Sequence, residues 1–148
     1  MATAQSKIAN IDLTVTRKKQ FTIDGDENRI IELNTSDMSI LSRIQDSYQK
    51  LEDLSNRAMS MSDSDFEETA KTLKEIDGEM RDLINYIFDS DIADTCAPEG
   101  TMYDVFNGQF RFEHILDRLI SLYENNMDKE YKLMQKNIKK YTDKYTGK

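Results

Sequence analysis

The chain has 148 residues, enough for one compact domain spanning residues 1–148 with a small core. Its net charge is −8, and its 38% hydrophobic and 32% charged residues predict a folded, soluble protein rather than a disordered one. No apolar run approaches the roughly 18 residues that a membrane span requires, and the first residues lack the apolar stretch of a signal peptide. We therefore expect a cytoplasmic protein that has no membrane partner.

Alternating apolar residues near the N-terminus predict short strands. Residues 11–15 alternate apolar and polar side chains as a half-buried strand does, and the pattern resumes over 21–23 and 29–33. Asp24-Gly25, between the last two runs, is a hairpin turn signal. Residues 11–34 are thus predicted to form a β-hairpin or small antiparallel sheet.

The same turn resembles the opening of a calcium loop, because Asp24, Asp26 and Asn28 alternate. Such a loop needs glycine at its sixth position and glutamate at its twelfth. Arg29 and Thr35 stand at those positions, and the flanks have strand patterns rather than helix patterns. We therefore favour a hairpin turn over a metal site.

Two amphipathic helices are predicted next. The first runs from about Asp37 to Met59, and the second ends near Phe88. Gly78 falls inside the second helix, where close approach of a neighbouring element is one explanation for it. The predicted buried stripe of the first helix is Leu41, Ile44, Tyr48, Leu51 and Ala58.

Residues 89–109 form the longest irregular stretch, and loops of this length are usually functional or disordered. Its aspartates, Asp89, Asp91 and Asp94, are interpreted as a solvated helix exit rather than a metal cluster. The apolar residues in and after its second half are candidates for a partner-binding surface or, alternatively, for the core. These candidates are Tyr103, Phe106, Phe110 and Phe112.

A third helix is predicted from near Phe110 to about residue 141. Its apolar face is broad at first and narrows after Tyr123, and a narrow seam is typical of pairing with one other helix. About 30 residues span roughly 45 Å, more than a core of this size needs, so we expect the far end to project. The second set of partner-binding candidates, with the core as the alternative, is Tyr131, Met134, Ile138 and Tyr141.

The predicted fold class is therefore α+β, mostly α, with an N-terminal β-hairpin followed by a three-helix bundle that has a long C-terminal helix. The chain is expected to divide into a flexible start (1–10), the hairpin region (11–34), the helical region (35–142) and a flexible tail (143–148).

One cysteine and one histidine limit the chemistry that the chain can carry. Cys96 alone forms neither an internal disulfide nor a thiolate zinc cluster. A Cys96–His114 pair stays arithmetically possible, beside the alternative of a partly buried thiol and an imidazole on a helix surface. The chain lacks a glycine-rich phosphate loop and the motifs HExxH, CxxC and GxSxG. We expect no enzyme activity, no metal and no cofactor.

The charge is unevenly distributed. Residues 129–148 hold seven lysines and two acidic residues, a local charge of +5, which leaves −13 on residues 1–128. This layout suits self-association or docking on a partner of opposite polarity, although a solvated acidic surface with a basic tail explains it as well. Nucleic-acid binding would depend on the last 20 residues alone, so none is expected.

Several ordered segments resemble small tail-morphogenesis proteins of phages and prophages of Gram-positive bacteria, the tail assembly chaperones. The resemblance covers residues 11–146 and rests on FTIDGD, IIELN, ILSRI, IFDSDI, PEGTMYDVFNGQFRF and KYTDKYT. It implies a non-enzymatic protein of the host bacterial cytoplasm that binds the helical tape measure protein and other tail proteins. We also expect a homo-oligomer. The alternative is a phage-encoded inhibitor that binds a host defence protein through the acidic residues 1–128.

Overall fold

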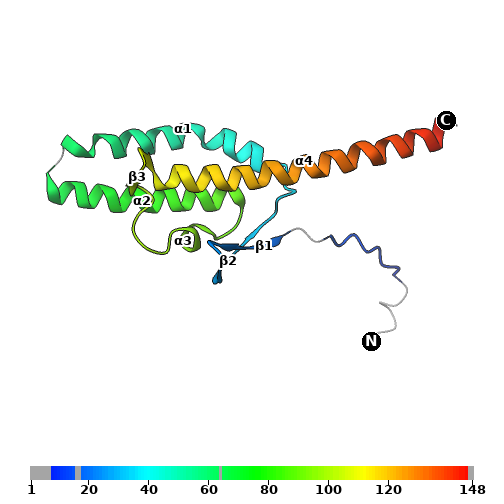
Figure 1. The fold of residues 1–148 in the computed structure, drawn as a ribbon, viewed down its shortest axis with the longest axis horizontal. Coiled ribbons are helices and arrows are strands. Elements are labelled where there is room, and N and C mark those ends of the chain that lie inside the picture. The colour runs from blue at the N-terminus through cyan, green and yellow to red at the C-terminus, as the bar shows by residue number, and fades with distance from the viewer. Residues whose placement is uncertain (1–7, 16–17, 64, 147–148) are drawn as a thin grey trace.

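A hairpin sheet, a bundle of three helices and one projecting helix end make up the molecule (Figure 1). The computed structural model describes residues 8–15, 18–63 and 65–146, with the backbone alone at 62, 63, 141, 142, 145 and 146. The structure is 63% helical, with a two-stranded antiparallel sheet ahead of the helices. The predicted fold class, α+β and mostly α, is confirmed.

The sheet consists of β1 (Lys19–Ile23) and β2 (Asp26–Leu33), which pair antiparallel. The two turn residues, Asp24 and Gly25, have φ of 54° and 72°, as a two-residue type I′ turn requires. The Asp24 carboxylate binds Arg29 at 3.1 Å, and the described residues contain no group of three or more potential metal ligands. The hairpin interpretation of this turn is confirmed.

The strand predicted at residues 11–15 is absent. This segment has no regular secondary structure, and the side chains of Ile11, Leu13 and Val15 are exposed. Alternation predicts a half-buried strand only where a second strand and an apolar surface are available. Among the described residues β1 pairs with β2 alone, so this part of the hairpin prediction was wrong.

The helix α1 (Ser39–Met59) leads through the short helix η2 (Ser60–Asp63) into α2 (Phe66–Phe88). Asp65 caps α2, because its side chain accepts a hydrogen bond from the Glu68 backbone N–H at 2.7 Å. The two helices lie side by side in Figure 1 and bury one continuous apolar layer. Its fully buried members include Leu54, Ile76, Met80 and Ile84.

The buried face of α1 matches the predicted stripe in part: Ala58 is buried, and Ile44 and Leu51 pack against the core. Leu41 is 50% exposed and Tyr48 is 70% exposed, whereas Ile40 and Ser47, one position earlier, are buried. One residue turns a helix by about 100°, so the face that α1 turns to the core is rotated from the predicted one. Two apolar side chains are left on the outside of the bundle.

The stretch after α2 is more ordered than predicted. It contains α3 (Ala93–Cys96) and a second hairpin of β3 (Val105–Phe106) and β4 (Gln109–Phe110). The turn of this hairpin is Asn107-Gly108, with φ of 52° and 75°, the same geometry as Asp24-Gly25. Asn-Gly is a strong hairpin signal, so this element could have been found in the sequence.

The last helix, α4 (Arg111–Thr146), packs along α1 and α2 with its first half and then leaves the body (Figure 1). It extends past residue 142, where the helical region was predicted to end. Phe112, Leu116, Leu119 and Tyr123 of its first half are buried in the core. No helix in the described ranges is long and apolar enough to cross a membrane.

Candidate protein-binding surfaces

Two of the predicted partner-binding residues belong to the core. Tyr103 is 4% exposed and Phe112 is 3% exposed. The Tyr103 ring lies 5.2 Å from the Phe112 ring and 5.4 Å from that of Phe110, so the three rings form one packed cluster. Of the two alternatives given for these candidates, the core holds for Tyr103 and Phe112, because the β3–β4 hairpin and the start of α4 pack these rings inward.

The other two aromatic candidates lie at the edge of this cluster. Phe106 is 40% exposed and packs edge-on against His114, while Phe110 is half-buried. Beside them the exposed side chains of Met59 and Val105 border a shallow pocket of about 220 Å³. We call Met59, Val105 and Phe110 the tip pocket. Val105 was not among the candidates chosen from the sequence, although the Asn107-Gly108 turn places it on an exposed strand.

The second set of candidates lies on the projecting part of α4. Tyr131, Met134 and Ile138 are 43%, 48% and 61% exposed, and every residue from 131 to 140 is exposed. We call these three residues the seam. Spacings of three and four place them on one side of the helix. The side chain of the fourth candidate, Tyr141, lies outside the described residues.

Between α1 and α4 the seam continues into a groove of about 400 Å³. Its apolar lining comes from Leu41 on α1 and from Tyr123, Met127 and Tyr131 on α4, with Glu124, Asn125 and Asp128 at its edge. Tyr123 holds the two helices together, because its hydroxyl donates to the Asp37 carbonyl at 2.8 Å. We call this feature the α1–α4 groove. Its lining carries two carboxylates and no cationic side chain.

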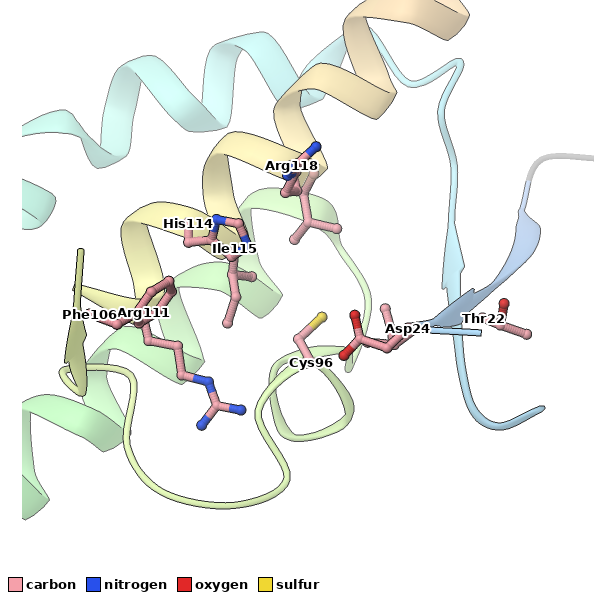
Figure 2. Close-up of a pocket in the computed structure, with 10 residues that line it drawn as sticks. Thr22, Asp24, Cys96, Phe106, Arg111, His114, Ile115 and Arg118 are labelled. Atoms are coloured by element: carbon pink, nitrogen blue, oxygen red, sulfur yellow. The ribbon is translucent and has the colours of Figure 1, made fainter. Parts of the chain in front are cut away.

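A third concave site lies between the first hairpin, α3 and α4, with a volume of about 280 Å³ (Figure 2). It brings Cys96 and His114 to one pocket, but Figure 2 shows His114 on α4 well separated from the Cys96 side chain. Burial raises the pKa of the Cys96 thiol to about 11, with Arg29 opposing and Asp24 adding to the shift. A thiol in this state is a poor nucleophile, which favours the structural interpretation of Cys96.

The arginines of this pocket have different surroundings. Arg111 donates to the Glu99 backbone carbonyl and lies 3.9 Å from the Asp104 carboxylate, so its charge is used within the chain. Arg118 is exposed at the rim, and its side chain points away from Cys96 (Figure 2). Arg111 and Arg118 therefore do not point together into the pocket, as the side chains of a catalytic or anion-binding site would.

The seam, the α1–α4 groove and the tip pocket are apolar surfaces of the size and chemistry that contact another protein chain. Comparison of the chain with protein-family models, with curated proteins and with solved structures finds no match. The resemblance to tail assembly chaperones therefore stays a prediction from the sequence. The surfaces themselves define the chain as a candidate protein-binding protein.

Proposed function

We propose that the protein is a non-enzymatic chaperone of phage tail assembly that binds the helical tape measure protein in the host cytoplasm. The observation that carries the proposal is the seam. A helix that leaves the body while carrying Tyr131, Met134 and Ile138 on one side has apolar surface that its own fold leaves uncovered. The resemblance of residues 11–146 to tail assembly chaperones supplies the identity of the client.

Binding through such surfaces has a simple physical basis. An amphipathic client helix buries its apolar side chains against the seam or in the tip pocket, at a spacing that matches one helix face. The methionines Met59, Met127 and Met134 adapt to clients of different shape, because the thioether side chain is flexible. Net charge of −8 keeps the loaded complex in solution.

The alternative, an acidic inhibitor of a host defence protein, is less well supported. Several carboxylates of the body are neutralised within the chain: Asp37 binds Arg43 at 2.7 Å, Asp77 binds Arg81 at 3.0 Å, and Glu79 binds both Lys50 and Arg57. A surface that imitates nucleic acid needs rows of unpaired anions. The ion pairs remove these three carboxylates from such a row, although the net charge of residues 1–128 stays at −13. The exposed apolar seam is the observation that favours an apolar mode of binding.

Co-expression with the tape measure protein of the same phage or prophage genome tests the proposal. We expect the tape measure protein to aggregate alone and to be soluble, and to co-purify, with the full-length chain. Ile138→Asp is expected to reduce the soluble fraction, whereas Leu133→Asp, the same change at an exposed site away from the seam, is expected to leave it unchanged. A tape measure protein that never co-purifies with the full-length chain would refute the function.

The salt dependence of binding separates the two candidates. An apolar client complex is expected to survive from low salt to about 0.5 M NaCl, since screening weakens charge contacts rather than apolar ones. An acidic inhibitor would instead capture a basic host protein and lose it steeply over the same range.

A further inference from the structure

The charged side chains that flank the apolar side of α4 change in sign along the helix. Toward the body, the helix carries Glu124 and Asp128 beside the α1–α4 groove. The described lysines of α4 all follow Asp128, and Lys132 and Lys139 are exposed, while the two arginines of the helix, Arg111 and Arg118, lie nearer its start. A helix that is acidic in one part and basic in the next is complementary to a reversed copy of itself.

The apolar residues of α4 cross this boundary without a break. Met127 and Tyr131 line the α1–α4 groove, and Met134 and Ile138 continue on the same side at spacings of three and four. Groove and seam are thus two halves of one apolar stripe. The groove half has a second wall, Leu41 of α1, which is 50% exposed.

We propose that two copies of the chain pair antiparallel along this stripe, with their Tyr131 side chains near the two-fold axis. The Met134–Ile138 half of each copy then lies in the α1–α4 groove of the other copy. The contact is the same for both copies, so it closes as a dimer and does not extend into a filament. The inference rests on the proposed function only in treating the seam as a binding surface, and client binding at the seam then competes with pairing.

The antiparallel direction follows from the flanks of the stripe. At about 3.6 residues per turn, Glu124, Asp128, Lys132 and Lys139 all lie on the same flank. An antiparallel pairing centred on Tyr131 turns this flank toward its counterpart, with Glu124 beside Lys139 and Asp128 beside Lys132 of the other copy. A parallel pairing would instead lay the lysine-rich half of one copy beside the lysine-rich half of the other.

The first test measures mass without any client present. Sedimentation of the full-length chain over about 1 to 100 µM is expected to show a monomer–dimer equilibrium and no larger species. Ile138→Asp is expected to weaken dimerisation by at least about tenfold, because it places a charge in the buried stripe. Leu133→Asp is the matched control, expected to leave it unchanged. Both sites are exposed within one chain, so circular dichroism should show an unchanged helix content.

The second test reads the direction of pairing. Glu124→Lys and Lys139→Glu are each expected to weaken the dimer by about threefold to tenfold, and the double variant is expected to restore it. Lys136→Glu, on the opposite side of the helix from the stripe, is the control. A strictly monomeric full-length chain, or a double variant no tighter than either single one, would overturn the inference.

The pairing and the proposed function can be refuted independently of each other. A monomer that still keeps the tape measure protein soluble would refute the pairing and leave the function standing. If the double variant regains the dimer affinity but the chain binds no tape measure protein, the pairing stands and the proposed function is refuted.

Discussion

Asp37 is the residue at which the three long helices are tied together. Its carboxylate accepts hydrogen bonds from the Ser39 backbone N–H at 2.9 Å and from Arg43 at 2.7 Å, and its carbonyl accepts the Tyr123 hydroxyl. Arg43 in turn donates to the carbonyl of Ile87 at the end of α2 at 2.8 Å. Asp37 thus connects the three helices at the point where α4 leaves the body: its side chain reaches α2 through Arg43, and its backbone carbonyl binds Tyr123 of α4.

This arrangement predicts a pH-dependent contribution to stability. Burial by itself would raise the pKa of Asp37, but the hydrogen bonds from Arg43 and Ser39 outweigh it and hold the pKa below its ordinary 3.8. A depressed pKa in the folded state means that the charged form stabilises the fold above the ordinary pKa. This stabilisation is lost as the pH falls through the folded-state pKa.

Asp37→Asn is therefore expected to lower the free energy of unfolding by about 1 to 2 kcal/mol at pH 7. The difference from the unaltered chain should shrink as the pH falls below 3.8. Urea unfolding over a pH series from neutral to acid measures it. Asp46→Asn, at an exposed position of α1, is the control and should cost little at any pH. A difference that stays constant over the series would contradict the assignment.

Among the helices and strands, α2 contains a residue that lowers its helical stability, Gly78. Close approach of a neighbour was one explanation for a glycine inside this helix. A Cβ at this position would meet nothing within 4 Å, so no neighbour requires the glycine. Its cost is the extra backbone freedom that the unfolded chain loses on folding.

Gly78→Ala is expected to stabilise the protein by about 0.5 to 1 kcal/mol and to raise the melting temperature by a few degrees. Gly108→Ala is the matched comparison. It also has open space around its Cβ, but its φ is +75°, which side chains other than glycine rarely adopt. This change is expected to destabilise by about 1 kcal/mol. Thermal unfolding of both variants measures the effect, and the two melting temperatures are expected to shift in opposite directions. A lower melting temperature for Gly78→Ala would refute the conclusion that no neighbour requires Gly78.

At the scale of the whole molecule, α4 serves the fold with its first half and leaves its second half in solvent (Figure 1). Asn126 still contacts the body, since its amide donates to the Thr35 carbonyl at 3.1 Å, and Met127 packs against the core. Residues 131–140 are all exposed. The part of the helix that packs on the body therefore ends near Glu130, and the projecting part begins with Tyr131, whose hydroxyl still lies 3.6 Å from the Met38 sulfur.

A chain that ends after Glu130 is expected to keep the fold and to lose the seam. In dilute solution, its melting temperature should stay within a few degrees of the full-length value, because the removed residues bury little apolar surface. It should also be monomeric and fail to bind the tape measure protein. Circular dichroism and sedimentation measure the two effects. If the truncated chain no longer unfolded cooperatively, the far half of α4 would be shown to stabilise the body, and the expectation would be contradicted.

Features that depend on local chemistry could be predicted from the amino-acid sequence. Helical spacing of apolar residues predicted the three long helices, and Asp24-Gly25 predicted the first hairpin, because few residues accept the left-handed backbone of a type I′ turn. The projecting end of α4 followed from the narrowing of its apolar face after Tyr123. The Asn107-Gly108 hairpin was predictable by the same turn chemistry.

Which apolar side chains are covered became known from the packing of the folded chain. Tyr103 is buried while Phe106, three residues later, is partly exposed, and Ile40 is buried while Leu41 is half exposed. Ile11, Leu13 and Val15 have a strand pattern and no strand. A periodic pattern shows that one face of an element is apolar, but burial also requires an opposing element, and only the packing of distant segments supplies that element.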